Sequence, residues 1–167
     1  MNISNQRRVG TGLDVHPLVQ GSFLIVGGIK IPCQLTSEGH SDGDALIHAV
    51  VDALLGAAGL GDIGTYFSSN EAKWKNASGK LFLSHTAIMI QREGWNIENI
   101  DATVILQNPK LLNYVPKIRE NLSQILSIPK NVISVKSTTT DHLGFIGEEK
   151  GWAVQALALL KRTNNLV

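Results

Sequence analysis

The chain has 167 residues, 43% of them hydrophobic, a formal net charge of +1 and a single cysteine, Cys33. This length predicts one domain, because most domains contain roughly 100–200 residues, and the near-neutral charge argues against nucleic acid as a partner. One cysteine excludes an intrachain disulfide and every multi-cysteine zinc or iron–sulfur site.

The ends of the chain indicate where the protein resides. The polar start, MNISNQRR, leads into a strand-like segment without a secretory apolar core. The longest apolar run near the C-terminus, residues 156–160, is too short to span a bilayer. We therefore expect a cytoplasmic protein with no membrane partner, with a processed organellar form as the alternative.

The first quarter of the chain predicts β-structure. Residues 8–16 alternate loosely in polarity and predict a strand. Residues 22–31 predict a hairpin that turns at Gly27 and Gly28. A loop is expected over residues 35–43.

A helix is expected from about Ser41 to Ala58. Ser41 and Asp44 have the spacing of a capping box, which is typical of a helix start. Gly59 is a residue that can end the helix, and residues 62–64 are expected to form a turn.

The rest of the chain alternates helix and strand patterns. We expect a loop over 65–77, helices over 78–93 and 114–127, and strands over 97–106, 132–138 and 151–161. The last segment is also compatible with a helix, since alanine and leucine favour one. The alternation predicts an α+β fold in which a single mixed β-sheet carries helices on one face. The other face then needs cover, which suggests an oligomer.

Two N-terminal segments, residues 12–16 and 38–48, carry side chains that bind metal ions. In a strand, residues two apart face the same side, so Asp14 and His16 can reach one ion together. His48 lies about one turn inside the expected helix. One carboxylate and two imidazoles leave one position of a tetrahedral zinc site open to substrate, as catalytic zinc sites do. Taken singly, these residues also fit a solvated edge strand and a hydrogen-bonded core histidine; the combination favours a metal.

Metal-bound histidines need hydrogen-bond partners on their second ring nitrogens. Asp44 and Asp52 are the candidates. The alternatives are a helix cap for Asp44 and a solvated position for Asp52, and the solvated position is preferred for Asp52.

Three later segments carry polar groups suited to phosphates. The hydroxyl-rich residues 136–145 can hold phosphate oxygens, and Asp141 suits a hard cation such as Mg²⁺. Residues 106–112, with Lys110, can form a pocket for a base and phosphate. Asp62 can accept hydrogen bonds from substrate hydroxyls. Each segment alone also fits ordinary structure: a strand edge, a strand-to-helix connection and a turn.

Taken together, these motifs resemble the 2-C-methyl-D-erythritol 2,4-cyclodiphosphate synthase family. The similarity extends from about Arg8 to Lys161, and several motifs in order at matching spacing make it highly specific. The motifs are Gly-Leu-Asp14-Val-His16, His40-Ser-Asp-Gly-Asp-Ala-Leu-Ile-His48, Asp52-Ala-Leu-Leu-Gly-Ala, Leu-Gly-Asp62-Ile-Gly64, Asn-Pro-Lys110 and Thr-Thr-Thr140-Asp141-His-Leu-Gly-Phe145.

The resemblance implies an enzyme that converts 4-diphosphocytidyl-2-C-methyl-D-erythritol 2-phosphate into the cyclic diphosphate and CMP. It implies Zn²⁺ held by Asp14, His16 and His48, and Mg²⁺ or Mn²⁺ at the substrate phosphates with Asp141. It also implies a homotrimer with sites between subunits, whose interior would receive the uncovered face of the sheet. The whole chain, residues 1–167, is expected to form one domain of this kind.

The resemblance also assigns roles to individual residues. The catalytic residues would be His40, Thr139 and Asp141, and Asp141 stands where the family often has glutamate. The substrate-binding residues would be Asp14, His16, His40, Ser41, Asp62, Gly64, Leu106, Lys110, Leu111, Leu112, Thr138, Thr139, Thr140, Asp141 and Phe145. The alternative function is a zinc-dependent phosphoester hydrolase, in which a metal-bound hydroxide attacks the phosphate.

Overall fold

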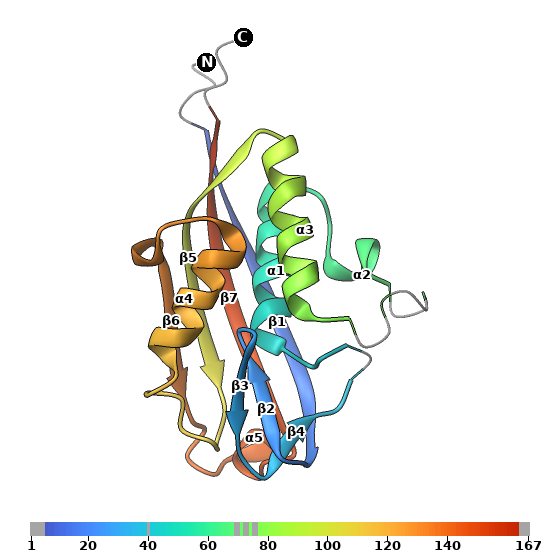
Figure 1. Cartoon of the computed structure of the whole chain (residues 1–167), viewed down its shortest axis with the longest axis vertical. Coiled ribbons are helices and arrows are strands. Elements are labelled where there is room, and N and C mark those ends of the chain that lie inside the picture. The colour runs from blue at the N-terminus through green and yellow to red at the C-terminus, as the bar shows by residue number, and fades with distance from the viewer. Residues whose placement is uncertain (1–5, 40, 69–70, 72–73, 75–76, 164–167) are drawn as a thin grey trace.

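A five-stranded mixed β-sheet runs the length of the molecule (Figure 1). The computed structural model describes residues 6–39, 41–68, 71, 74 and 77–163. The strands follow the order β4-β1-β7-β5-β6, and all neighbours are antiparallel except β5 and β6. Their bounds are Arg7–Gln20 for β1, Leu35–Ser37 for β4, Trp95–Ile105 for β5, Ile133–Thr138 for β6 and Gly151–Arg162 for β7.

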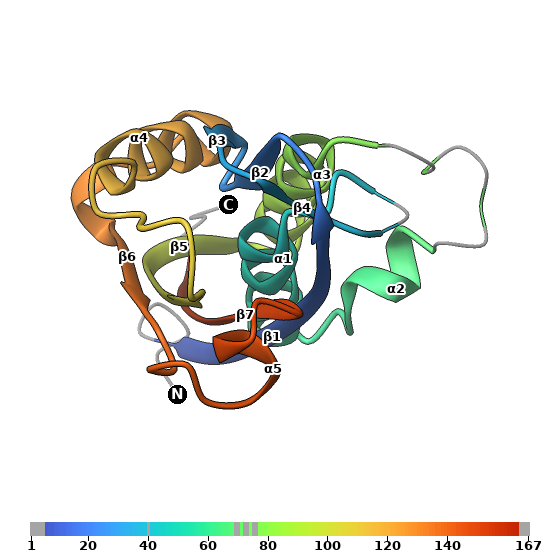
Figure 2. The same cartoon turned by 90° about the horizontal axis from the view of Figure 1, so that it is seen from below.

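Helices cover one face of this sheet, as the view from below shows (Figure 2). The long helices are α1 (Ala45–Ala58), α3 (Gly79–Arg92) and α4 (Val115–Leu126). The hairpin of β2 (Phe23–Val26) and β3 (Ile29–Pro32) lies on the same side. Short helices complete the fold: α2 (Ile63–Tyr66), η3 (Lys130–Val132) and α5 (Gly144–Gly147). The expected α+β architecture and the final strand are confirmed.

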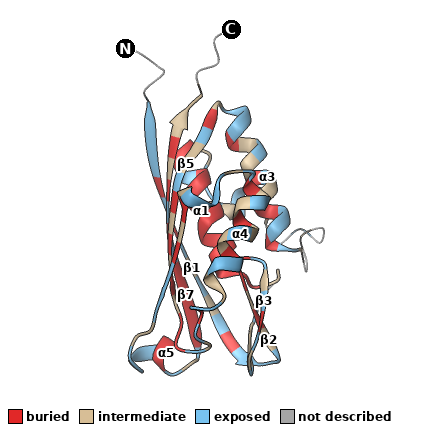
Figure 3. Cartoon of the chain, turned by 60° about the vertical axis from the view of Figure 1, so that its left-hand side comes forward, coloured by how far each residue is buried: buried red, intermediate tan, exposed pale blue. Residues whose placement is uncertain are grey.

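The core lies between the sheet and α1, where buried positions gather (Figure 3). Twelve of the fourteen residues of α1 are buried, as expected for a helix packed on several sides. Two glycines of β1 allow this close packing. A Cβ atom at Gly10 would lie 2.1 Å from the Ala53 carbonyl oxygen, and one at Gly12 only 1.9 Å from that of Ala49. β1 and α1 therefore touch through their backbones.

Helix α1 begins later than the sequence predicted. Its N-cap is Asp44, whose side chain accepts a hydrogen bond from the Ile47 N–H, so the expected start at Ser41 is wrong. Gly43 explains the difference, because its φ of 67° is a left-handed conformation incompatible with a helical turn. The cap role of Asp44 and the left-handed end at Gly59 are confirmed.

Two short elements were expected to be irregular. Residues 35–37 form β4, which pairs with the end of β1, although a loop was expected there. Residues 63–66 form the one-turn helix α2 after Asp62, where a turn was expected. Elements of three or four residues have no periodicity to reveal them.

The second face of the sheet carries exposed apolar side chains. On β1, Val9, Leu13 and Val15 are 63%, 66% and 47% exposed, and Leu157 of β7 is 40% exposed. These strands are paired to each other, so the four side chains form one apolar patch on neighbouring strands. Among the described residues, none of the long helices α1, α3 and α4 lies on this face, and only the one-turn helix α5 sits on it, beside the start of β7 (Figure 2).

Thr86 on α3 offers a direct test of core packing. It is fully buried, and its hydroxyl has no hydrogen-bond partner among the residues that the structure describes. Because burying an unpaired hydroxyl is costly, Thr86→Val should raise the free energy of unfolding by about 1 kcal/mol. Denaturant titration measures this change, and Thr86→Ser, which keeps the hydroxyl but loses the methyl group, should destabilise the fold. A less stable Thr86→Val protein would contradict the assignment.

Candidate metal centre

Three ligand atoms from β1 and α1 converge at one point. The Asp14 Oδ2 atom lies 3.0 Å from His16 Nε2 and 3.0 Å from His48 Nδ1, and the two nitrogens are 3.1 Å apart. Around a tetrahedral ion with bonds of about 2.0–2.1 Å, ligand atoms are separated by roughly 3.3 Å. The triangle of Asp14, His16 and His48 therefore fits a single metal ion.

The second nitrogen of each imidazole also has a partner. His16 Nδ1 lies 3.3 Å from the Glu38 carbonyl oxygen, and His48 Nε2 lies 3.1 Å from Ser41 Oγ. Protons on these two nitrogens leave the inward nitrogens free to bind a cation, which is the usual arrangement around a metal. Ser41, expected to bind substrate, thus also orients His48.

The two aspartates proposed for this orienting role are placed elsewhere. Asp44 accepts hydrogen bonds from the Gly27 and Gly28 N–H groups as well as from its own helix. Asp52 accepts one from the Ile63 N–H at 2.7 Å, which fixes the start of α2, so its expected solvated position is also wrong.

The electrostatics of the centre favour a charged Asp14. Burial alone would raise the pKa of Asp14, but the hydrogen bonds and charges of His16 and His48 outweigh it and hold this pKa well below its usual range. Burial opposes protonation of His16, yet the hydrogen bond and charge of Asp14 raise the pKa of His16 above the ordinary histidine value. A proton therefore competes with a cation mainly at His16.

Metal binding should consequently depend on pH. Because the hydrogen bond and charge of Asp14 raise the pKa of His16 above the ordinary histidine value, a proton on His16 competes with the ion, and metal affinity should fall about tenfold per pH unit below that pKa. Asp14 stays ionised in this range and adds no proton. Zinc titrations against a competing chelator between pH 5.5 and 8 measure the effect. An affinity that does not change across this range would refute the competition.

A shallow pocket of about 260 Å³ opens beside the three ligands. Gly64 and Ser41 line it, and Asp62 lies just outside, where it accepts hydrogen bonds from the N–H and hydroxyl of Thr65. Its wall is aromatic: Phe67 packs against Phe82 and Trp74, with ring centroids 4.8 and 5.2 Å apart. The sequence analysis missed this wall, because only the fold brings these rings together. His40 lies outside the described residues.

A second pocket, of about 270 Å³, lies where β5 and β6 end. It contains Pro109 and Ser137, which belong to the two segments expected to bind base and phosphate, and five of the individually named substrate residues: Leu106, Lys110, Leu111, Thr138 and Thr139. Leu112 is 80% exposed and lies outside it. Phe145, 50% exposed, packs near Gly151 instead.

Asp141 lies on the exposed loop after β6. Its carboxylate accepts a hydrogen bond from the Thr139 hydroxyl at 3.2 Å, and that hydroxyl accepts one from the Asp141 N–H at 3.3 Å. Thr140 donates its hydroxyl to the Leu143 carbonyl and so shapes the same loop. One exposed carboxylate beside hydroxyl groups suits a cation that also binds phosphates.

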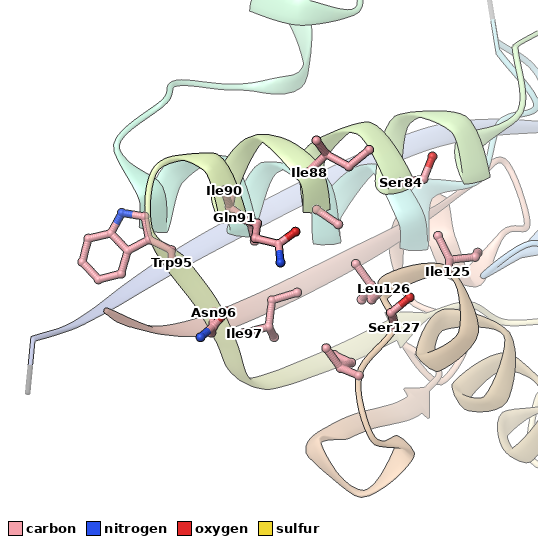
Figure 4. Close-up of a pocket in the computed structure, with 12 residues that line it drawn as sticks. Ser84, Ile88, Ile90, Gln91, Trp95, Asn96, Ile97, Ile125, Leu126 and Ser127 are labelled. Atoms are coloured by element: carbon pink, nitrogen blue, oxygen red, sulfur yellow. The ribbon is translucent and has the colours of Figure 1, made fainter. Parts of the chain in front are cut away.

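A third pocket, of about 360 Å³, lies away from these groups between α3, the start of β5 and the end of α4 (Figure 4). Its walls include Ile88, Ile97, Ile125 and Trp95, and none of the described residues that line it is titratable.

The sequence model of the YgbB family matches residues 7–161. The chain belongs to the YgbB family. Among curated relatives of this YgbB-family chain, a protein of Salinibacter ruber named 2-C-methyl-D-erythritol 2,4-cyclodiphosphate synthase is 47% identical over 154 residues, which cover 92% of this chain and 98% of the relative. The resemblance recognised in the motifs is thereby confirmed.

Solved structures agree with this family. The bifunctional IspDF from Campylobacter jejuni has a TM-score of 0.92 and 38% identity over 95% of this chain, which spans only 43% of that longer chain. IspF from Plasmodium falciparum, solved as a CDP complex, has a TM-score of 0.84 and 37% identity over 96% of this chain and 99% of its own. No helix formed by the described residues is long and apolar enough to cross a membrane.

Proposed function

We propose that this chain converts 4-diphosphocytidyl-2-C-methyl-D-erythritol 2-phosphate into 2-C-methyl-D-erythritol 2,4-cyclodiphosphate and CMP. The observation that carries the proposal is the metal triangle of Asp14, His16 and His48 in a chain that matches synthases of this name over nearly its whole length. In this reaction an oxygen of the 2-phosphate attacks the β-phosphorus. The bond from that phosphorus to CMP breaks, CMP leaves with its oxygen, and no water is consumed.

The reacting groups are both polyanionic, so they repel until charge is neutralised, and the reaction depends on positioning and charge stabilisation rather than on a protein nucleophile. Zn²⁺ at the triangle and Mg²⁺ or Mn²⁺ beside Asp141 would supply that neutralisation and polarise the phosphoryl oxygens. Thr139 and His40 would steady the reacting phosphate. Holding the folded-back substrate in a fixed geometry can contribute about 7–11 kcal/mol of the barrier.

The remaining substrate would be bound from two sides. Ser41, Asp62 and Gly64 would contact the erythritol and its phosphate near the metal triangle. The cytidine end would lie in the pocket at the ends of β5 and β6, held by residues 106–112 with Thr138 to Asp141 and Phe145 close by. CDP in the solved relative from Plasmodium falciparum supports a nucleotide ligand.

We further propose a homotrimer in the cytoplasm, in which residues 1–167 form one domain. Among the described residues of one chain, the metal pocket and the pocket at the ends of β5 and β6 share no lining residue. Sites completed between subunits would bring the two together. The exposed apolar patch on β1 and β7 would then line the trimer interior.

A charged side chain in this apolar patch should break the assembly. Val9→Glu places a carboxylate at a position 63% exposed in the single chain, and burying it between subunits would be costly. We expect light scattering after gel filtration to show the mass of one chain instead of three, with lost cyclisation. Leu81→Glu, at an exposed position on α3, is the matched control and should leave the mass unchanged. A Val9→Glu protein that remains trimeric would place the interface elsewhere.

The activity itself is tested with the purified chain, the cytidyl substrate, Zn²⁺ and Mg²⁺. Mass spectrometry should detect CMP and the cyclic product in equal amounts. In ¹⁸O-labelled water neither product should carry label. Label in CMP or in a linear sugar phosphate would instead establish the phosphoester hydrolase.

A further inference from the structure

Gln107 belongs to the segment proposed to hold the cytidine end, but its buried side-chain amide has no assigned role in the reaction. It lies two residues after the end of β5 and is 5% exposed. Its carbonyl oxygen accepts a hydrogen bond from the Lys110 ammonium group at 3.5 Å, so its backbone belongs to the pocket at the ends of β5 and β6. A buried amide needs partners for both its oxygen and its nitrogen.

Those partners lie on the other loop, which carries Asp141. Gln107 Oε1 accepts a hydrogen bond from the His142 backbone N–H at 3.3 Å, and Gln107 Nε2 lies 3.4 Å from His142 Nε2. Gln107 therefore links the pocket at the ends of β5 and β6 to the loop that carries Asp141.

The conformation of that loop needs such support. Asp141 and His142 both have positive φ angles, of 49° and 66°, which residues with a Cβ atom adopt at a cost. The His142 backbone packs closely against α5, since a Cβ atom at Gly147 would lie 2.1 Å from the His142 carbonyl carbon. Two hydrogen bonds also hold the loop: the Asp141 N–H donates to the Thr139 hydroxyl, and the His142 N–H donates to Gln107 Oε1.

We infer that Gln107 is a positioning residue that holds the Asp141 carboxylate in place for the divalent cation at the substrate phosphates. The inference rests on the proposed function for the role of Asp141. Removing the Gln107 amide should let the loop relax from its left-handed conformation and turn the carboxylate away. The effect should therefore appear as weaker binding of the second cation, with the zinc triangle intact.

Binding of Mn²⁺ to the full-length protein loaded with zinc and CDP tests this, with electron paramagnetic resonance counting the free Mn²⁺. Loss of an orienting partner typically weakens metal binding about 10–100-fold, so Gln107→Leu should bind Mn²⁺ at least tenfold more weakly. Gln107→Glu keeps an oxygen acceptor for the His142 N–H and should bind Mn²⁺ more tightly than Gln107→Leu. Gln124→Leu, the same change at an exposed position on α4, should match the unmodified protein.

In turnover assays, the Mg²⁺ concentration for half-maximal rate should rise in Gln107→Leu while the rate at saturating Mg²⁺ recovers. Wild-type Mn²⁺ affinity in Gln107→Leu, or equal weakening in both Gln107 variants, would overturn the inference. Should Gln107→Leu fail to fold, Gln107→Met carries the same test. Absence of Mn²⁺ binding in the unmodified protein would also overturn it. Mn²⁺ binding without a cyclic product would overturn the proposed reaction alone.

Discussion

Replacing His48 with alanine should release zinc from the purified protein and stop formation of the cyclic product. His48 supplies one of the three ligands found within the described part of the chain, and its Nδ1 atom lies within 3.1 Å of both partners. Two remaining ligands hold a cation far more weakly, so metal affinity should fall by more than about 100-fold, beyond the loss seen for orienting groups. Elemental analysis after dialysis measures the zinc content directly.

The control for His48→Ala is His85→Ala, which removes an exposed imidazole from α3. That protein should keep its zinc. Unchanged zinc in His48→Ala would remove His48 from the ligand set, and with it the convergence of β1 and α1 on one ion.

Replacing Asp44 with alanine should cause the largest loss of stability among single substitutions at the helix caps. The buried Asp44 carboxylate accepts hydrogen bonds from Gly27, Gly28 and Ile47, at 2.6 to 3.1 Å. Alanine would leave three N–H groups without this partner, and an unsatisfied buried group costs about 1–3 kcal/mol. We expect the free energy of unfolding to fall by about 3 kcal/mol, since relief from burying the charge offsets part of the loss.

The pH dependence of Asp44→Ala has a definite sign. Burial raises the pKa of Asp44 to about 6 against the opposing N–H bonds. A raised folded-state pKa contributes stability at low pH that is lost as the pH rises through that value. The penalty should therefore be larger at pH 5 than at pH 7.5 in denaturant titrations. Ser78→Ala, at the exposed cap of α3, should cost only about 1 kcal/mol; equal penalties for the two caps would contradict this account.

Local spacing was enough to predict two of the three metal ligands. Asp14 and His16 lie two apart on a strand, and that period alone places both on one face. His48 was predicted from the combination of motifs and the family resemblance, and it meets the other two because the fold packs α1 against β1, which the glycine-rich strand allows. Long, periodic elements such as α3 and α4 were also predicted to within a few residues.

Contacts between distant residues could not be predicted in this way. The partners of Asp44 are the turn glycines 16 and 17 residues earlier, and no local pattern records that pairing. The same holds for Ser41 on His48 and for the Glu38 carbonyl on His16, because a backbone oxygen has no sequence signature. Residue types indicate which side chains can bind a metal or substrate, but the tertiary fold determines which of those side chains lie in contact.

The backbone contact at Gly12 links metal content to folding. Because Gly12 lets α1 rest directly on β1, an ion held by Asp14, His16 and His48 would act as a clamp between the first strand and the central helix. Any side chain at position 12 would push β1 and α1 apart and so separate the three metal ligands. At a concentration 1,000 times its dissociation constant, a ligand that binds only the folded state adds about 4 kcal/mol to stability. The concentration of zinc would then affect the free energy of unfolding as well as the rate of the reaction.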